Sequence, residues 1–130
     1  MEARAAAALP VQDLERAKRW YSEKLGLNPV EGDTPGGYMY ELSAGTGFLL
    51  FESSGQPSGS HTQMALEVQD VEATVKDLKG RGVKFEDYDT EQLKTKDGIA
   101  DFNGFKGAWF KDSEGNLIAV GEPIPARVRS

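Results

Sequence analysis

The phrase VQDLERA at residues 11–17 returns as VQDVEAT at residues 68–74. Each copy follows an apolar stretch that can form a strand, AAAALPV in the first case and TQMALEV in the second. In each copy an aspartate, Asp13 or Asp70, stands where its side chain can accept a backbone N–H at the start of a helix. The repeat therefore predicts two similar strand-to-helix corners in one chain.

The residues after each aspartate favour a helix. In the first copy, apolar side chains recur at the spacing of one helical face, at Leu14, Ala17, Tyr21 and Leu25. Gly26 then stands where a left-handed residue commonly ends a helix. Val71, Val75 and Leu78 form the matching stripe in the second copy. We expect helices over Asp13–Leu25 and Asp70–Gly80.

Stretches with strand character surround both helices. In the first copy they are AAAALPV, LNPVE, GGYMYELS and GFLLFES, and in the second TQMALEV, VKFEDYD, GIADFN, GAWFKD and LIAVGE. The order of strand, helix and further strands thus occurs twice. It predicts an α+β fold made of two βαβββ modules. The expected boundaries are one domain over 1–130, modules over 5–53 and 61–123, and a Ser/Gly-rich linker over 54–60.

Composition excludes several classes of function. The net charge is −6 and the sequence pI is about 4.8, which argues against nucleic acid as a partner because phosphate backbones need a basic surface. The chain has no cysteine, which excludes disulfides and thiolate chemistry. No apolar run approaches the length of a membrane span. We expect a cytoplasmic protein whose carboxylates serve solubility or face a cationic ligand.

Three stretches together resemble the vicinal oxygen chelate superfamily, which includes glyoxalase I, bleomycin and fosfomycin resistance proteins and extradiol dioxygenases. They are LPVQDLERAKRWYSEKLGL (Leu9–Leu27), MALEVQDVEATVKDLKGRGVKF (Met64–Phe85) and AWFKDSEGNLIAV (Ala108–Val120). The last resembles the family's Asp-Pro-x-Gly-Asn hairpin, with Ser113 in place of proline. The resemblance implies that the two βαβββ modules form curved mixed sheets around a cleft and, commonly, that the protein is a homodimer. It says much less about chemistry.

The resemblance also implies a divalent metal held from four strands. Counted from the family's motifs, the ligand positions in this chain are Ala6, Leu50, Gln63 and Ala119, and a shift of two residues would replace Leu50 by Glu52. Alanine and leucine donate nothing to a metal, whereas a catalytic site needs about three protein ligands. The expectation is therefore no metal and no other cofactor. The alternative is an atypical divalent site made by Gln63, Glu52 and His61, the only histidine.

Strand alternation suggests which side chains line the cleft. In TQMALEV, Gln63 and Glu67 are expected to face it while Met64 and Leu66 pack under the helix. The alternation in GFLLFES assigns three further residues to the cleft: Phe48, Leu50 and Glu52. Trp109 occupies the position of a cavity-facing tyrosine in the dioxygenase-like relatives, although a tryptophan there can also be core. The faces of Tyr38 and Tyr40 stay open.

Three functions compete at this point. The first is a metal-free protein that binds a small aromatic or cationic molecule in its cleft, as bleomycin resistance proteins bind their drug. The second is a lyase, isomerase or dioxygenase with an atypical metal site. The third is a module for assembly or regulation. The sequence leaves open which molecule binds, whether any reaction is catalysed, and whether modules pair within the chain or across a dimer.

Overall fold

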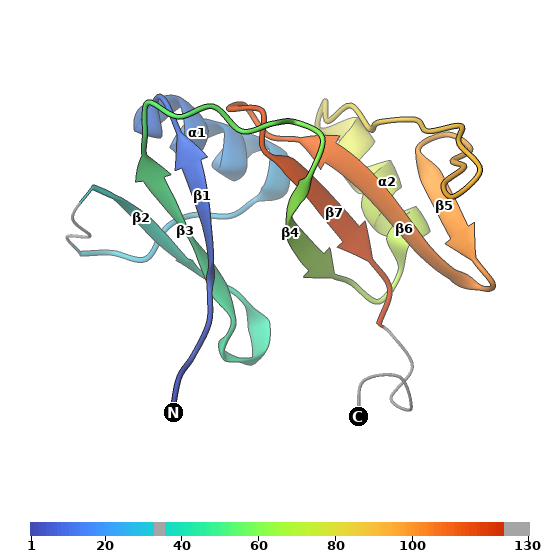
Figure 1. The fold of residues 1–130 in the computed structure, drawn as a ribbon. Helices are drawn as coiled ribbons and strands as arrows, with labels where there is room; N and C mark the ends of the chain where they lie inside the picture. The colour runs from blue at the N-terminus through green and yellow to red at the C-terminus, as the bar shows by residue number, and fades with distance from the viewer. Residues whose placement is uncertain (33–35, 124–130) are drawn as a thin grey trace. The chain divides into compact units, whose positions relative to one another are not determined.

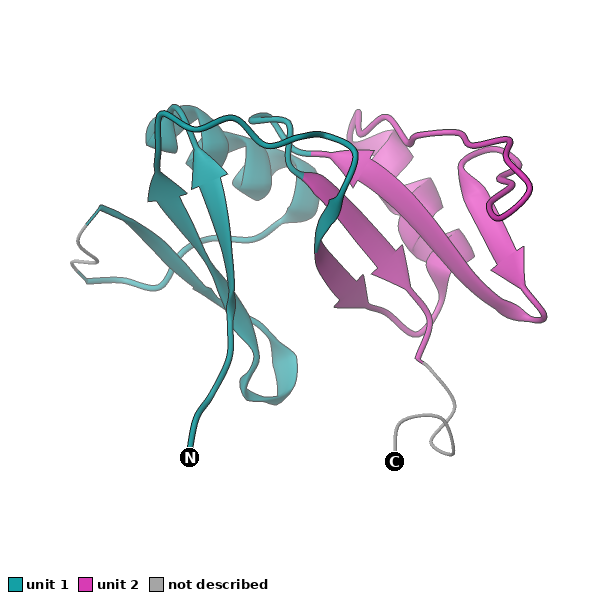
Figure 2. Cartoon of the chain, in the orientation of Figure 1, with its two compact units in different colours: residues 1–63, 112–116 teal, residues 64–111, 117–130 magenta. Residues whose placement is uncertain are grey.

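A computed structural model describes residues 1–32 and 36–123. The chain divides into two compact units (Figure 2): residues 1–63 with 112–116 form the first, and residues 64–111 with those from 117 onward form the second. The turn at 112–116 lies in the second half of the sequence, yet it belongs to the first unit. The module boundaries expected from the sequence remain predictions.

The first unit is a three-stranded sheet with a helix on one face (Figure 1). The strands run in the order β1-β3-β2, with β1 parallel to β3 and β2 antiparallel to it. The helix α1 contacts β2 and β3. In chain order the elements are β1 (Ala7–Val11), α1 (Leu14–Trp20), the π-helical segment η1 (Tyr21–Leu25), β2 (Gly37–Glu41), the 3-10 segment η2 (Ser43–Gly45) and β3 (Gly47–Glu52).

The first predicted helix is confirmed at both ends. Asp13 has extended backbone angles, and its carboxylate accepts the N–H of Arg16 at 3.0 Å, which satisfies one of the free donors at the helix start. The last turn widens into the π-helical segment before the chain ends the helix at Gly26. That residue has φ of 69°, a conformation that side chains disfavour and glycine adopts freely.

Aromatic side chains fill the space between α1 and its sheet. The rings of Tyr40 and Phe48 stack at 4.6 Å between centroids, and Tyr21 from the helix lies 5.7 Å from Tyr40 and 5.6 Å from Phe48. These residues are fully buried, as are Leu9 and Leu50. Burial of such large apolar side chains is the main stabilising term of a unit this small.

A buried carboxylate ties the turn at 112–116 to η1. Asp112 accepts the hydroxyl of Tyr21 at 2.6 Å and the side-chain amide of Asn116 at 3.0 Å. It also accepts the backbone N–H groups of Glu114 and Asn116 at 2.8 and 2.9 Å. Burial, and after it the charge of Asp112, raises the pKa of the Tyr21 hydroxyl well above its usual value. The tyrosine therefore stays a neutral donor.

A second carboxylate, Glu114, lies against the start of α1. It accepts the backbone N–H groups of Gln12 at 3.0 Å and Asp13 at 3.1 Å, and the Arg16 guanidinium donates to both of its oxygens at 2.8 and 2.9 Å. Burial opposes ionisation of Glu114. The hydrogen bonds from Arg16, from the Ser113 hydroxyl and from the two backbone donors outweigh that effect and lower its pKa to about 2.

The second unit is a four-stranded sheet with the helix α2 on one face (Figure 1). The strand order is β4-β7-β6-β5, and β6 pairs antiparallel with both β5 and β7. Within the described residues its elements are β4 (Thr62–Glu67), α2 (Val71–Gly80), β5 (Ile99–Phe102), β6 (Phe105–Lys111) and β7 (Leu117–Gly121).

The second predicted helix is also confirmed. Asp70 caps α2 by accepting the N–H of Ala73 at 3.0 Å, just as Asp13 caps α1. Glu122 is a second acceptor at this helix start. Its carboxylate receives the N–H of Val71 at 3.1 Å and that of Lys106 at 2.9 Å.

A two-residue hairpin joins β5 to β6. Asn103 and Gly104 have φ of 55° and 101°, as the central residues of a type I′ turn require. The turn places Phe102 directly opposite Phe105, and the pairing continues to Ala100 opposite Gly107. The register of β5 against β6 is thereby fixed.

Two predicted strands are absent from the described part of the chain. LNPVE is not a strand, although the N–H of Val30 donates to the carbonyl of Met39 at 2.8 Å. VKFEDYD is not a strand either: it contributes isolated bridges of Phe85 with Phe110 and of Asp89 with Lys94, and the N–H of Glu86 donates to the carbonyl of Trp109. Single contacts of this kind hold a loop at a sheet edge without forming a ladder.

The described residues contain no helix long and apolar enough to cross a membrane.

Candidate functional site

The sheet of the second unit has one face covered by α2 and one that the helix does not cover. On the helix side, Ala108 and Phe110 of β6 are fully buried, as are their partners Val120 and Ile118 on β7. Strand alternation puts Trp109 on the opposite side, which we name the open face. The open face of β6 and β7 carries small residues and larger ones, and two of them, Gly107 and Leu117, are buried: the residues are Phe105, Gly107, Trp109, Lys111, Leu117, Ala119 and Gly121.

Trp109 is half-buried on this face and has aromatic neighbours. Its ring meets that of Tyr88 edge to face, at 5.7 Å between centroids and an angle of 89°. The ring centroids of Phe102 and Phe105, which face each other across the β5–β6 hairpin, are 5.9 Å apart, and each side chain is 38% exposed. Together with Trp109 these rings form an apolar patch, and exposed apolar patches commonly mark binding sites, so the open face is a candidate binding surface.

Glu67 and Gln63 of β4 are the polar residues expected near this face. The alternation predicted for β4 is present, because Met64 is buried while Ala65 and Glu67 are exposed. The N–H of Val68, next to Glu67, donates to the carbonyl of Gly121 at 2.8 Å. The end of β4 therefore lies beside the end of β7, where Gly121 is the last residue. The carboxylate of Glu67 thus belongs to the same sheet as Trp109.

Gln63 carries an unusual polar atom. Its side-chain oxygen is buried and has no hydrogen-bond partner in the described chain, a property it shares with the Tyr40 hydroxyl and the Asn116 amide oxygen. A buried acceptor without a donor is unfavourable by about 1–3 kcal/mol. A donor on a bound molecule would remove that penalty.

The orientation expected for Phe48 and Leu50 is corrected by the structure. Both are fully buried on the α1 side of the first sheet, where Phe48 stacks on Tyr40. The sequence pattern GFLLF is apolar on both strand faces, so alternation alone could not show which residues face the helix. Leu49 and Phe51 have the opposite orientation and are half-buried.

Glu52 ends the same strand in an exposed position and belongs to the α1 side as well. It lines a shallow groove of about 290 Å³ together with Gln12, Ser53 and Ser54. Tyr38 and Tyr40, whose faces the sequence left undecided, also lie on the α1 side. Tyr40 is buried in the core, and the Tyr38 hydroxyl donates to Glu15 of α1.

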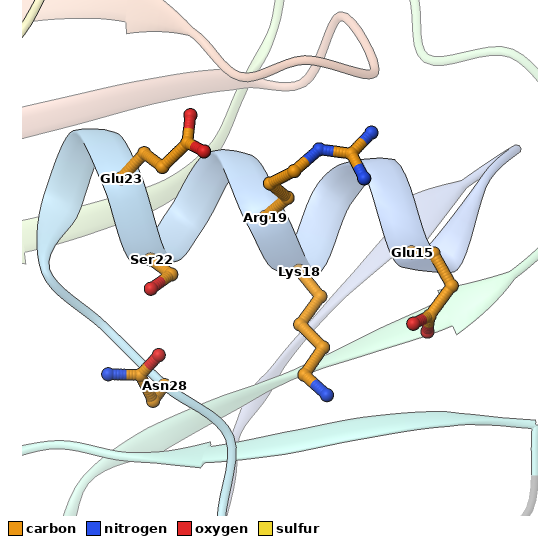
Figure 3. A pocket seen from close by; sticks show the side chains of 6 residues that line it. All are labelled: Glu15, Lys18, Arg19, Ser22, Glu23 and Asn28. Atoms are coloured by element: carbon orange, nitrogen blue, oxygen red, sulfur yellow. The ribbon is translucent and has the colours of Figure 1, made fainter.

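A groove on the outside of α1 was not anticipated (Figure 3). Its volume is about 290 Å³, and its lining is polar: Glu15, Lys18, Arg19, Ser22, Glu23 and Asn28. The ammonium of Lys18 lies 5.1 Å from the ring centre of Tyr38, a cation–π distance. Charged side chains on the exposed face of a helix are ordinary, and the groove contains none of the residues singled out from the sequence.

The residues present do not fit the divalent ion that the resemblance implies. Ala119 lies on the open face and has no donor, and Leu50 is in the core. Gln63 is the one implied position with a suitable oxygen. His61, part of the alternative site, is exposed, and its Nδ1 is 2.8 Å from the Ser58 hydroxyl. No three His, Cys, Asp or Glu side chains gather around one point anywhere in residues 1–32 and 36–123.

Sequence reasoning missed Tyr88, Phe102, Phe105 and Gly107 as neighbours of Trp109. The stretch DFNGF does carry a usable signal, since an Asn-Gly pair between two phenylalanines predicts a tight hairpin with those rings side by side. The approach of Tyr88 from a loop has no such local signature.

Several solved structures have a similar fold. A glyoxalase / bleomycin resistance protein from Catenulispora acidiphila is 25% identical with a TM-score of 0.64, and the match covers 95% of this chain and 100% of that one. TnmS3 from Streptomyces sp. CB03234, described as an antibiotic binding protein, is 25% identical with a TM-score of 0.64 and coverage of 95% and 99%.

A third similar structure contains a metal. It is a variant of the fosfomycin resistance protein FosX from Listeria monocytogenes in complex with Mn(II) and a dihydroxypropylphosphonic acid. It is 13% identical, has a TM-score of 0.69, and the match covers 100% of this chain and 99% of that one. At this identity the likeness concerns the fold alone.

A comparison with curated protein sequences gave no match. The comparison with protein families did: residues 4–120 match one family over nearly the whole chain. The match agrees with the two mixed sheets of three and four strands and with the repeated strand-to-helix corner. The chain belongs to the Glyoxalase/Bleomycin resistance protein/Dioxygenase superfamily.

Proposed function

We propose that this protein binds a small aromatic molecule on the open face of its second sheet, without a divalent metal ion. The observation that carries the proposal is the half-buried Trp109, which has Ala119 directly opposite it and Gly107 and Gly121 next to this pair on the same face. A large flat ring beside small residues offers both a stacking surface and space.

A relative supports this class of function. TnmS3, which has the same fold over 95% of this chain, is described as an antibiotic binding protein. Binding by such a protein needs a shaped apolar surface and a few polar anchors, and it does not need a reaction centre. The open face offers these features.

Glu67 and Gln63 are the proposed polar anchors. A carboxylate at the edge of an aromatic surface favours a ligand that carries a positive charge, because the ring face and the carboxylate both attract a cation. The side-chain oxygen of Gln63 adds an acceptor for an N–H or O–H group. We therefore favour a ligand with a flat apolar part and a cationic or hydrogen-bond-donating group.

The metal-free state can be tested directly. Since Ala6 and Ala119 stand at two implied ligand positions and Leu50 is buried, the purified protein should retain much less than one divalent ion per chain after dialysis. Binding of the aromatic probe 2-naphthol should be unchanged by a chelator. Elemental analysis that finds about one Zn, Mn, Ni or Fe per chain would contradict this part of the proposal.

The binding surface is tested by substitution. Trp109→Ala should weaken 2-naphthol binding, measured by calorimetry, by about 1–3 kcal/mol, the usual scale for an aromatic anchor. Trp20→Phe is the matched control, because Trp20 lies in α1 of the first unit. Circular dichroism should show both variants folded. Unchanged affinity in folded Trp109→Ala would place the ligand elsewhere, and an unfolded variant would make Trp109 a core residue.

The charge of Glu67 is tested with two probes of similar shape. Glu67→Gln should weaken binding of 2-naphthylmethylammonium, a cation, more than binding of neutral 2-naphthol. The substitution removes the charge at nearly constant volume. Glu52→Gln serves as the control, since Glu52 belongs to the other sheet. Equal losses for the two probes would remove Glu67 as a charge anchor.

The superfamily's enzymatic alternatives, a lyase, an isomerase or a dioxygenase, receive no support from a specific residue.

The pairing into a homodimer remains a proposal from the family resemblance. In each unit, apolar side chains on the sheet face away from the helix are half-buried, for example Phe51 and Trp109. A monomer by light scattering at micromolar concentration would contradict the dimer and leave the binding proposal intact.

A further inference from the structure

Tyr88 lies beside Trp109 on the open face, although its own segment is neither strand nor helix. The segment passes along the edge of β6 beyond the end of β5, where the N–H of Glu86 donates to the carbonyl of Trp109 at 2.8 Å. The Phe85 ring packs on Phe110, on the helix side of the sheet, at 5.4 Å between centroids. The segment therefore holds β6 from both faces and places one aromatic ring on each.

The Thr95 side chain fixes the backbone at Tyr88. Its hydroxyl accepts the N–H of Tyr88 at 2.8 Å and donates to the carboxylate of Asp87 at 2.8 Å. The N–H of Thr95 donates in turn to the carbonyl of Tyr88 at 2.9 Å. Both backbone polar groups of Tyr88 are thus bonded to one residue, which lies seven positions later in the chain.

The carboxylate of Asp87 also closes this loop at its far end. It accepts the N–H of Gly98 at 2.9 Å. Gly98 has φ of 85°, and an added Cβ there would lie only 2.8 Å from the Cβ of Phe85, so the end of the loop packs directly against its beginning. A loop closed in this way holds the Tyr88 ring ready for a ligand, which reduces the entropy lost on binding.

The Tyr88 ring brings an unused hydrogen-bond donor to the open face. The side chain is half-buried, and burial, followed by the charge of Glu86, raises the pKa of its hydroxyl above the usual value. The hydroxyl therefore stays protonated at neutral pH. Within residues 1–32 and 36–123, no side chain or carbonyl accepts a hydrogen bond from it.

We propose that Tyr88 donates a hydrogen bond from its hydroxyl to an oxygen of the bound aromatic molecule, and that Thr95 positions it for this contact. The inference rests on the proposed function and deepens it, because it adds an oxygen acceptor, such as a carbonyl, to the features expected of the ligand. Glu67 and the side-chain oxygen of Gln63 are acceptors, whereas Tyr88 supplies a donor. These anchors would therefore recognise different groups of the same molecule.

The experiment uses two probes of nearly the same shape. They are 2-acetylnaphthalene, whose carbonyl oxygen accepts a hydrogen bond, and 2-isopropenylnaphthalene, in which a CH2 group replaces that oxygen. Calorimetry gives the ratio of the affinity for the acetyl probe to that for the isopropenyl probe. This ratio should be about fivefold lower in Tyr88→Phe than in the wild type, the scale of one neutral hydrogen bond. Tyr38→Phe, which removes a hydroxyl from the first unit, should leave the ratio unchanged.

The positioning role of Thr95 is tested by rescue. Thr95→Val removes the hydroxyl at nearly constant shape and should lower the ratio as Tyr88→Phe does, whereas Thr95→Ser keeps the hydroxyl and should retain the ratio of the wild type. Thr90→Val is the matched control in the same loop, because the Thr90 hydroxyl accepts the N–H of Leu93 at 2.9 Å and has no contact with Tyr88. Circular dichroism should show every variant folded.

The outcomes separate the inference from the function on which it rests. If the wild type binds neither probe and does not bind 2-naphthol, the proposed function fails. If the wild type binds both probes and Tyr88→Phe has the same ratio, the function stands and the donor role of Tyr88 is wrong. If Tyr88→Phe lowers the ratio while folded Thr95→Val does not, Thr95 does not position the donor, which overturns that part of the inference.

Discussion

In the first unit the N–H groups of Gln12 and Asp13, ahead of α1, donate to Glu114, whereas in the second unit the N–H of Val71 at the start of α2 donates to Glu122. In both copies of the phrase, a glutamate therefore accepts backbone N–H groups at the helix start in addition to the capping aspartate. The two glutamates differ in their surroundings. The side chain of Glu114 is fully buried and held by Arg16, while Glu122 is half-buried and accepts the backbone N–H groups of Val71 and Lys106.

The difference continues beyond the helix starts. The first unit contains the buried hydrogen bonds of Asp112 and the stacked aromatic core around Tyr40. The second unit has Trp109 half-buried and two phenylalanines 38% exposed. Satisfied buried polar networks rigidify a structure, and accessible apolar surface is available for binding. Two copies of one motif can therefore divide stability and recognition between them.

The largest expected effect concerns Asp112. Asp112→Ala should lower the free energy of unfolding by about 3–5 kcal/mol, because the buried Tyr21 hydroxyl and the Asn116 amide would lose their acceptor. Asp77→Ala is a matched control on the exposed surface of α2, where its ion pair with Arg81 is solvent-exposed, and it should have an effect below about 1 kcal/mol. Urea denaturation measures both. A small effect at Asp112 would mean that the first unit does not depend on this network.

The next effect is a dependence on pH. Because the folded pKa of Glu114 is about 2, below the usual value of 4.5, its ionised form stabilises the native state above pH 4.5. That contribution, about 3 kcal/mol, should disappear as the pH falls from about 4.5 to about 2. In Glu114→Gln, the free energy of unfolding should therefore fall less between pH 6 and pH 2.5 than it does in the wild type. An identical acid profile in wild type and variant would show that the network is not the cause.

A smaller effect is expected at the second helix start. Glu122→Ala removes an acceptor for Val71 and Lys106, and it should lower the free energy of unfolding by about 1 kcal/mol, since Glu122 is only half-buried and its two partners are neutral backbone donors. Chemical denaturation of Glu114→Ala beside Glu122→Ala tests the comparison. Equal losses in the two variants would mean that burial does not distinguish the two carboxylates.

Much of the fold was predictable from the sequence because the signals are local. The aspartate caps, the helical stripes and Gly26 determine where α1 and α2 begin and end. The orientation of β3 was not predictable, because Phe48 to Phe51 are apolar on both faces. Only packing against the helix decides which side is the core.

The candidate site was predictable in part. The alternation in β4 suggested Glu67 and the family resemblance suggested Trp109, and their part in a binding site stays a prediction. Tyr88 and Phe102 contact the site region through a loop and a hairpin, and such contacts depend on tertiary structure. The roles of Asp112 and Glu114 were missed for the same reason, since their partners lie about a hundred residues away in the sequence.

The two tryptophans allow the central comparison to be tested in one experiment. Each unit has one, Trp20 in α1 and Trp109 in β6, and each indole N–H gives its own signal in a ¹⁵N–¹H correlation spectrum, assigned with Trp20→Phe. During titration with 2-naphthol, the Trp109 signal should shift saturably while the Trp20 signal stays in place. A Trp109 signal that does not move up to the solubility limit of the probe, or a shift confined to Trp20, would contradict the account.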